Sequence, residues 1–301
     1  MIETIHLSKK FADIDAIKDL NCRIGDGSIY GLVGSNGAGK STFLRLIAGI
    51  YRQSSGELLY NGEPIFGRAE LRQEILLVPD QPVFFPGESL QGMASFYAGT
   101  YEYWDYDFYS EILQLFPLDP AMPLRKMSKG MQRQASLLLA LASRPKLLLL
   151  DEAFDGLDPV MRTTLKRILA REVLENGLTA IIASHNLREL EDICDEIGLL
   201  HEGGLIYENE LDSMNLGVYK LQLAFKTRPS REELEALGLE LLHEERHGSI
   251  LQLVIRGEKE EILQKLQTYS PLVLDLLPLS LEELFIYELE VKGYAVRELL
   301  S

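Results

Sequence analysis

The chain has 301 residues, of which 46% are hydrophobic, and it carries a formal net charge of −16. This length exceeds one typical domain and predicts two, and the apolar content is ample for packed cores and excludes a disordered chain. The acidic charge argues against a duplex nucleic-acid partner and against direct adsorption to an anionic membrane, because the chain would not neutralise their phosphates.

The sequence also has no feature of a membrane-spanning or disulfide-stabilised protein. No apolar run approaches the roughly 20 residues that cross a bilayer, and the N-terminus shows no apolar signal segment. The only cysteines, Cys22 and Cys194, are far apart and have no metal-ligand spacing. The sequence therefore predicts a soluble, cytosolic chain in which both cysteines are packing residues.

A glycine-rich loop at Gly34–Thr42 lies between a predicted strand and a predicted helix. Ile29–Val33 is a short apolar run typical of a buried strand, and Thr42–Ile50 has apolar residues at helical spacing. The loop matches the phosphate-binding pattern G-x-x-x-x-G-K-[ST]. Its glycines let backbone N–H groups wrap a polyphosphate, Lys40 brings a positive charge to the β/γ-phosphates, and Ser41 offers a hydroxyl to Mg²⁺. The residues expected to bind ATP here are Ser35, Asn36, Gly37, Ala38, Gly39, Lys40, Ser41 and Thr42.

The segment 88–145 is predicted to be mainly helical and is rich in aromatic residues. Such density often marks a contact surface, and the alternative is that most of the rings form a local core. Further along, Ser128 is a good N-cap for an apolar helix through Leu137 and Leu141, so the N–H groups of this helix can face an anion. The aromatic residues are Phe96, Tyr97, Tyr101, Tyr103, Trp104, Tyr106, Phe108 and Tyr109.

Two further buried strands each end in a residue suited to catalysis. Leu147–Leu150 delivers Asp151 and Glu152 at the carboxyl end of a strand, where ligands bind in open α/β sheets. Asp151 can hold Mg²⁺, and Glu152 is placed to polarise an attacking water. A strand at Thr179–Ser184 then ends at His185, whose side chain can reach the γ-phosphate if this strand lies parallel to the first.

From Tyr219 onward the pattern changes to that of a second, smaller domain. Tyr219–Lys226 alternates apolar and polar residues, as a half-buried strand does. Ser230 with Glu233 and Ser280 with Glu283 form capping boxes before helices. The order β-α-β-β-α-β plus a final helix, with Leu281, Leu284, Phe285 and Leu289 on one face, predicts a small α+β, ferredoxin-like domain without a catalytic constellation.

Taken together, these motifs resemble the ATP-binding cassette (ABC) family of transporter ATPases over roughly residues 2–210. The resemblance implies a P-loop NTPase α/β cassette at 1–215, with a helical subdomain at about 88–145, and an accessory α+β domain at 216–301. It implies catalytic roles for Lys40, Glu152 and His185, with ATP and Mg²⁺ as cofactors.

The resemblance assigns further residues one by one. Phe11 lies where the family has an aromatic that stacks on adenine, although core packing is the alternative for this ring. Gly156-Leu157-Asp158 looks like the loop that couples two subunits, with Asp158 as its acidic residue. A groove beside the segment after Asp80 receives a short helix of the permease in the family, and aromatic residues of the helical segment are expected to line it.

The signature motif of the family, usually LSGGQ, has the form Met127-Ser128-Lys129-Gly130-Met131 here. This S-K-G-M form resembles a bacterial branch of single-cassette exporters with a separate permease chain. The resemblance implies a head-to-tail dimer in which Ser128, Lys129 and Gly130 face the ATP of the partner subunit. Lys129 either adds a charge contact to phosphate or points to solvent.

A second departure concerns the metal ligands. The family places a glutamine after a proline, where this chain has Val78-Pro79-Asp80-Gln81. Aspartate oxygens also coordinate Mg²⁺, so either Asp80 or Gln81 serves beside Ser41 and Asp151.

The sequence thus predicts an ATP-hydrolysing cassette subunit that drives an exporter from the inner face of the cell membrane, as a homodimer or a heterodimer. The alternatives are a soluble ABC ATPase that acts on a macromolecule and a non-enzymatic nucleotide-sensing regulator whose C-terminal domain is the functional part. A P-loop kinase would not explain Ser128–Met131 or His185. The transported substrate is not encoded in these motifs.

Overall fold

The structure is a computed structural model that describes residues 1–210, 217–226, 229–280, 282–284 and 286–287. The chain divides into two compact units, Met1–Asn209 and Glu210–Ser301. The expected boundary at 215/216 lies outside the described residues. Each unit is described by itself.

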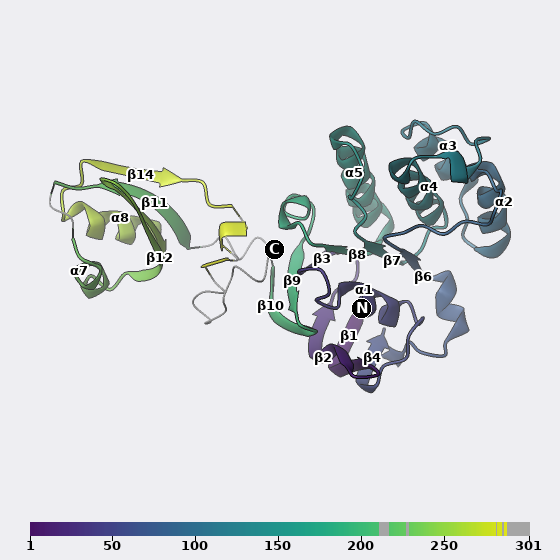
Figure 1. Ribbon diagram of the computed structural model, residues 1–301, viewed down its shortest axis with the longest axis horizontal. Coiled ribbons are helices and arrows are strands. Elements are labelled where there is room, and N and C mark those ends of the chain that lie inside the picture. Colours follow the sequence, from purple (N-terminus) through teal and green to yellow (C-terminus); the bar gives the residue numbers. More distant parts are fainter. Residues whose placement is uncertain (211–216, 227–228, 281, 285, 288–301) are drawn as a thin grey trace. The chain divides into compact units, whose positions relative to one another are not determined.

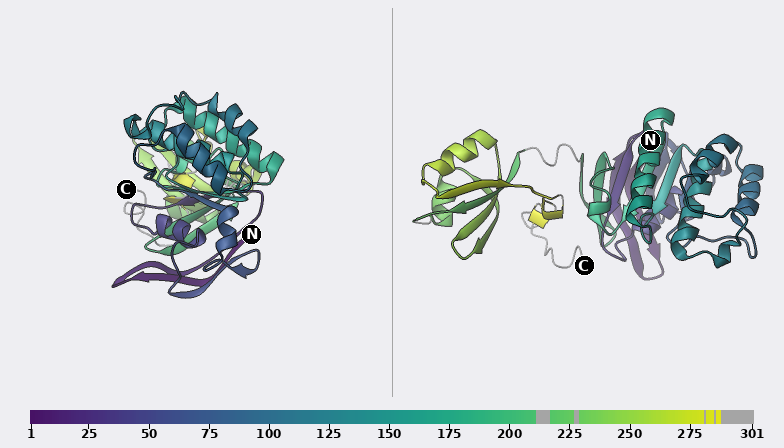
Figure 2. Two further views of the ribbon diagram at one scale, coloured as in Figure 1. Left: turned by 90° about the vertical axis from the view of Figure 1, so that its right-hand side faces the viewer. Right: turned by 90° about the horizontal axis from the view of Figure 1, so that it is seen from above.

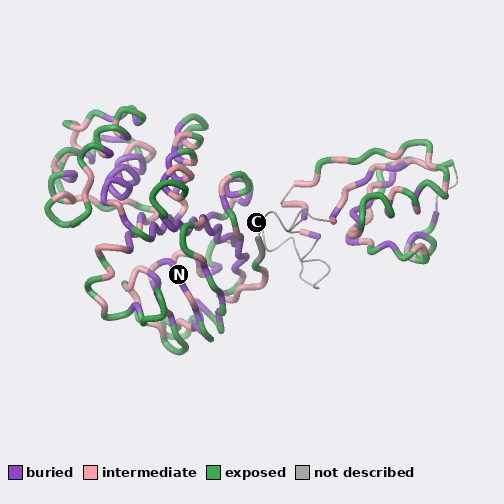
Figure 3. Tube along the Cα trace, turned by 180° about the vertical axis from the view of Figure 1, so that it is seen from behind, coloured by how far each residue is buried: buried purple, intermediate pink, exposed green. Residues whose placement is uncertain are grey.

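A six-stranded sheet forms the centre of the first unit, with the strand order β10-β9-β3-β8-β7-β6. The pairs β9–β3, β3–β8, β8–β7 and β7–β6 are parallel. Every residue of β3, β7 and β8 is buried (Figure 3), as continuous apolar runs predict for strands covered on both faces. The strands are β3 (Ile29–Val33), β6 (Ile75–Val78), β7 (Leu147–Asp151), β8 (Thr179–Ser184), β9 (Glu196–His201) and β10 (Gly204–Glu210).

An antiparallel sheet with the order β2-β1-β4-β5 covers one side of this unit (Figure 1). Helix α1 lies between the two sheets, and its Phe43, Leu44, Leu46 and Ile47 join a core with residues of both. The bounds are β1 (Ile2–Phe11), β2 (Ile14–Ile24), α1 (Lys40–Ile47), β4 (Ser55–Tyr60) and β5 (Glu63–Pro64).

Helix α1 begins at Lys40, as expected of the helix that follows the loop, and ends before Ile50, the last residue of the predicted helical spacing. It starts at Lys40 because Gly39, with a φ of 111°, ends the loop directly before it. It stops at Ile47 because Gly49, with a φ of 67°, turns the chain through the left-handed region.

The opposite face of the six-stranded sheet carries α4 and α5, and α2 and α3 pack with α4 in a helical group (Figures 1 and 2). Each of these four helices begins at a side-chain cap, namely Ser89, Asp105, Ser128 and Asp158. The helices are α2 (Leu90–Thr100), α3 (Tyr106–Leu113), α4 (Lys129–Ala142) and α5 (Pro159–Asn176), with short 3₁₀ turns at η1 (Ala69–Gln73), η2 (Leu124–Lys126) and η3 (Leu187–Glu189).

The second unit has a four-stranded antiparallel sheet in the order β12-β13-β11-β14, and its chain order is β-α-β-β-α-β. Both predicted capping boxes are present: Glu233 N donates to Ser230 Oγ at 3.2 Å, and Glu283 N donates to Ser280 Oγ at 3.3 Å. In the predicted final helix, Leu281, Phe285 and Leu289 lie outside the described residues. The elements are β11 (Val218–Ala224), α7 (Arg231–Ala236), β12 (Glu240–His247), β13 (Ile250–Arg256), α8 (Lys259–Gln267) and β14 (Val273–Leu277).

Within the described part of the chain, no helix has the length and apolar character needed to cross a bilayer.

Candidate functional site

The candidate site lies where four parallel strands of the central sheet end. Neighbouring strands β3, β8, β7 and β6 all point the same way, so their carboxyl ends meet at one edge of the sheet. The glycine-rich loop follows β3, Asp80 follows β6, Glu152 follows β7 and His185 follows β8. This edge is where ligands bind in open α/β sheets.

The glycine-rich loop has a backbone that only glycine accommodates at several points. A Cβ at Gly34 would lie 2.3 Å from the carbonyl oxygen of Leu200, and a Cβ at Gly39 would lie 2.5 Å from that of Ala16. Gly39 also has a φ of 111°, which is unfavourable for any side chain. The loop is therefore held close to neighbouring backbone, with its helix N-terminus and N–H groups available to an anion.

A cavity of about 510 Å³ opens in front of this loop. Asp80 and Glu152 reach it from β6 and β7, and Gln81 does not belong to its lining. The lining residues are Ile14, Asp15, Ala16, Lys18, Ser35, Asn36, Gly37, Gly39, Lys40, Ser41, Thr42, Asp80, Glu152 and Glu202.

Phe11, the expected adenine-stacking residue, is 38% exposed at the end of β1 and is not part of this lining. Its ring packs edge-on against Tyr51, with centroids 5.2 Å apart, and Lys9 Nζ lies 4.7 Å from its centroid. Ile14, which is 70% exposed, lines the cavity three residues later and was not singled out from the sequence. Ile14 lies next to the cavity only because β1 and β2 pair as a hairpin, so no local sequence pattern identifies it as a lining residue.

Lys40 is buried and directed back at its own loop. Its Nζ donates to the carbonyl oxygens of Gly34 at 2.6 Å and Ser35 at 3.2 Å. The same ammonium lies 3.4 Å from Glu152 Oε1. Lys40 therefore joins the loop after β3 to the acidic residue after β7.

Asp151 ends β7 beneath the loop, where Ser41 Oγ donates to its Oδ1 at 2.9 Å. Burial raises the pKa of the Asp151 carboxyl, and the Ser41 hydrogen bond offsets part of that increase. A hydroxyl and carboxylates facing one cavity form an oxygen donor set of the kind that Mg²⁺ prefers.

Asp151→Asn is expected to stabilise the folded chain against unfolding by urea. Because its pKa is raised, folded Asp151 holds a proton to higher pH than the unfolded chain, so stability falls as pH rises through that interval. At pH values above that interval the buried Asp151 carboxylate is charged and destabilises the fold. Replacing it with a neutral amide should raise the free energy of unfolding by about 0.5–2 kcal/mol. Urea unfolding at pH 7.5 and at lower pH measures this gain, which should shrink on acidification. Asp275→Asn, at an exposed residue, is the control and should leave stability unchanged. An Asp151→Asn variant that is less stable than the parent at pH 7.5 would contradict the prediction.

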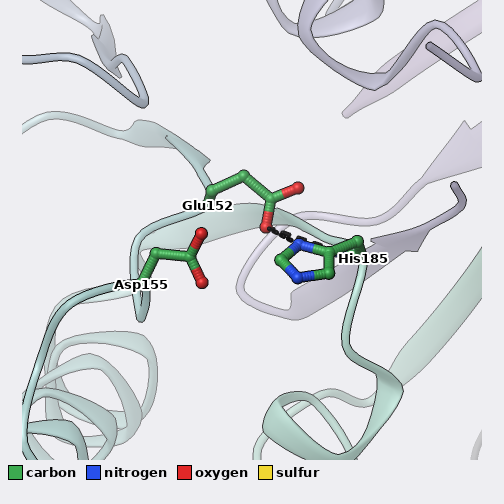
Figure 4. Close-up of side chains that lie close together, drawn as sticks. All are labelled: Glu152, Asp155 and His185. Atoms are coloured by element: carbon green, nitrogen blue, oxygen red, sulfur yellow. Dashed lines mark hydrogen bonds and ion pairs between the residues drawn. The ribbon is translucent and has the colours of Figure 1, made fainter. Parts of the chain in front are cut away.

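Glu152 has an unusual backbone and a fully engaged carboxylate. Its φ of 51° is in the left-handed region, which a non-glycine residue rarely occupies. One oxygen lies near Lys40, and the other lies 2.9 Å from Nδ1 of His185 (Figure 4). Since a carboxylate only accepts, the imidazole donates through Nδ1–H, and His185 is held beside Glu152 without lining the cavity itself.

Asp155 belongs to the same cluster and was not singled out from the sequence. Its carboxylate and the ligand atoms of Glu152 and His185 lie within 4.8 Å of one another (Figure 4). The chain turns back here because Asp155 N donates to the carbonyl oxygen of Glu152 at 3.1 Å. This cluster is part of the site at the ends of β7 and β8.

Arg133 is a further residue that sequence reasoning missed. It is buried on α4, and its guanidinium contacts the chain at Asp80, Asp151 and Glu152. Its partners are 18, 19 and 53 residues away, so no local pattern could have revealed it.

The segment Ser128–Gly130 lies apart from the cavity of its own chain. Ser128 caps α4, with its Oγ accepting from Met131 N at 3.2 Å, and Lys129 is exposed. A Cβ at Gly130 would lie 2.5 Å from the carbonyl oxygen of Gly156. Lys129 and Gln81 instead line an adjoining cavity of about 450 Å³, with Asp80, Pro82, Gln132, Arg133, Asp155 and Gly156.

Asp158 has a structural task in this conformation. Its Oδ1 accepts from Val160 N and Met161 N, both at 3.0 Å, and so caps α5. The exposed Asp158 therefore fixes where the helix starts, directly after the loop at Gly156.

The chain is similar in sequence and in fold to known proteins. A family described as "ABC transporter" matches residues 17–155. "ABC transporter ATP-binding protein YtrB" of Bacillus subtilis (strain 168) is 32% identical and aligns over 95% of this chain and 97% of its own length. "Bacitracin transport ATP-binding protein BcrA" of Bacillus licheniformis is 30% identical over 71% of each chain. A solved structure titled "Structure of ATP binding subunit of ABC transporter" has a TM-score of 0.65 and 25% identity, and covers 71% of this chain and 91% of that chain.

Proposed function

We propose that this chain, which belongs to the ABC transporter family, is the ATP-hydrolysing cassette subunit of a membrane exporter. The permease of this exporter is a separate chain. One relative is named a bacitracin transport ATP-binding protein, which supports a role in transport for this chain. One observation carries the hydrolytic part: the carboxylate of Glu152 is held between Lys40 and His185 in front of the glycine-rich loop.

In the proposed reaction, the loop N–H groups and Lys40 bind the β- and γ-phosphates of ATP. Glu152 accepts a proton from a water whose oxygen bonds to the γ-phosphorus, while the bond from that phosphorus to the bridging oxygen breaks and ADP leaves. His185, oriented by its hydrogen bond to Glu152, directs its other ring nitrogen at the transferring group.

Ser41, Asp151 and Asp80 are proposed to hold Mg²⁺. All three present oxygen atoms, and Ser41 and Asp80 line the cavity while Asp151 lies directly beneath Ser41. Asp80 is preferred over Gln81 because Asp80 lines the cavity in front of the loop, whereas Gln81 lines only the adjoining cavity. Bound Mg²⁺ would neutralise charge on the phosphates.

A second cassette is proposed to complete each site, either a copy of this chain or a related one. Ser128, Lys129 and Gly130 do not line the cavity of their own chain, so their anion-facing helix end is available to the ATP of a partner. Asp158, which is exposed at the start of α5, is proposed to belong to the loop that couples the two subunits.

The permease is proposed to dock at exposed apolar side chains after Asp80 and on α2. Val83 is 85% exposed, Phe85 is 51% exposed and Phe96 is 46% exposed. The rings of Phe85 and Phe96 pack edge to face with centroids 4.8 Å apart, so the two segments form one surface. In contrast, Phe108 is 4% exposed and belongs to the local core. The proposed contact surface therefore includes only some of the aromatic rings of this segment. Through this contact the cassette would lie on the inner face of the membrane.

Affinity isolation of tagged Glu152→Gln protein from detergent-solubilised native cells with ATP tests this proposal. We expect a stoichiometric membrane protein with several spans, and we expect Phe96→Asp to lose it while exposed Phe66→Asp, on a different segment, retains it. Recovery of soluble partners alone would instead favour an ABC ATPase acting on a macromolecule. Absence of ATP turnover by folded, ATP-bound parent protein would favour a nucleotide-dependent regulator.

A further inference from the structure

The guanidinium of Arg133 bridges the ends of two strands of the hydrolysis site. Its side chain is 8% exposed. Nη1 donates to the carbonyl oxygens of Asp151, at 3.2 Å, and Glu152. Nη2 donates to the carbonyl oxygen of Asp80 and, at 2.8 Å, to its Oδ1. One side chain thus satisfies four acceptors on the segments after β6 and β7.

These two segments carry two of the acidic residues that line the cavity. Asp80 and Glu152 both line it, and they come from chain segments joined here through Arg133. The guanidinium is planar and its donors have a fixed spacing, so it sets the distance between the two backbones. A lysine ammonium would keep the charge but could not hold both segments in one plane.

The backbone of Glu152 needs such support. Its φ of 51° is in a strained region for a non-glycine residue, and such conformations persist only when surrounding contacts hold them. Arg133 binds the carbonyl oxygen of this very residue. Without that bond, Glu152 is free to relax, which would displace its carboxylate from Lys40 and His185.

Arg133 also lies on the helix that begins with the signature segment. Ser128 caps α4, and Arg133 follows within the second turn. Gly130 of the same helix approaches the carbonyl of Gly156, in the segment that follows Glu152. A displacement of the start of α4 therefore moves the donors that hold Asp80 and Glu152.

We propose that Arg133 is a positioning residue, which sets the backbone of Glu152 and Asp80 and transmits the position of Ser128–Gly130 to the hydrolysis site of its own subunit. This inference rests on the proposed ATPase function. It predicts that Arg133 affects the rate of hydrolysis through Glu152 and has little effect on the affinity for ATP, because the glycine-rich loop and Lys40 do not contact it.

The test compares Arg133→Lys and Arg133→Gln with the parent chain by ATP dissociation constant, kcat and KM. We expect kcat to fall about 10- to 100-fold in both variants, as a small misplacement of a catalytic group can cause. The ATP dissociation constant should change less than about threefold, since each variant keeps the phosphate contacts. Exposed Arg125→Gln, just before α4, is the matched control and should behave as the parent.

A double-mutant cycle with Glu152→Gln distinguishes positioning from general destabilisation. If Arg133 acts through Glu152, adding Arg133→Lys to Glu152→Gln should lower the residual rate by less than about twofold. The inference would be overturned if the effects of Arg133→Lys and Glu152→Gln on kcat were fully additive. It would also be overturned if the parent were active and both single Arg133 variants kept its kcat. An inactive, ATP-bound parent would instead overturn the proposed ATPase function. If Arg133→Gln does not fold, Arg133→Lys alone decides, because its aliphatic stem keeps the packing.

Discussion

Glu152→Gln is expected to bind ATP, to lose at least about 100-fold in turnover and to remain dimeric with ATP bound. Glutamine has nearly the same shape, and its side-chain oxygen still accepts from His185 Nδ1–H, so the imidazole stays in place. It cannot accept a proton from water at neutral pH, and hydrolysis is the step expected to reopen the two cassettes. Phosphate release and size-exclusion chromatography with and without ATP measure the two effects.

The matched control is Glu57→Gln, at an exposed residue of β4 that does not line the cavity. It should leave turnover and the ATP-dependent association unchanged. A monomeric Glu152→Gln protein with the turnover of the parent would refute the mechanism, because Glu152 would then be neither the base nor the residue whose chemistry opens the dimer.

Lys40→Met is expected to remove turnover and to weaken ATP binding by at least about tenfold. A hydrogen bond to a charged group contributes about 1.5–3 kcal/mol, and Lys40 is a buried cation of the loop that lines the cavity. Methionine retains the aliphatic part of the side chain, so loss of packing is a minor contribution. In the nucleotide-free protein the change also leaves Glu152 without the ammonium 3.4 Å away. Titration with a fluorescent nucleotide measures the affinity for ATP, and phosphate release measures turnover.

Lys10→Met controls for the loss of a lysine at the surface. Lys10 forms an exposed ion pair with Asp15 at 3.6 Å, a kind of contact that contributes at most about 1 kcal/mol. Its variant should bind and hydrolyse ATP as the parent does. Unchanged ATP affinity in Lys40→Met would mean that the polyphosphate does not bind at this loop.

Much of the site follows from local sequence patterns. The apolar runs at Ile29–Val33, Leu147–Leu150 and Thr179–Ser184 identify buried strands. Each run is followed by residues of the candidate site, at the carboxyl end of its strand. Because neighbouring parallel strands end at one edge, the sequence predicts that the loop, Glu152 and His185 lie close together. The alternation in Tyr219–Lys226 and the two capping boxes likewise predicted the element order of the second unit.

The folded chain was needed to distinguish between the two proposed Mg²⁺ ligands after β6. From sequence, Asp80 and Gln81 are adjacent and both can offer an oxygen. In the structure, both residues line the adjoining cavity, but only Asp80 also lines the cavity in front of the loop. The direction of a side chain after a strand depends on the turn that follows, which a single-residue preference does not specify.

The amino-acid sequence by itself determined the phosphate loop, the acidic and histidine residues at strand ends, and the two-part division of the chain, because these depend on local periodicity and on residue types at short spacing. Tertiary structure alone decided that Arg133 joins Asp80 to Glu152, that Gly130 contacts Gly156 and that Ile14 rather than Phe11 lines the cavity. These contacts connect separate elements, and they exist only because the strand order β3-β8-β7-β6 and the packing of α4 on that sheet bring the elements together.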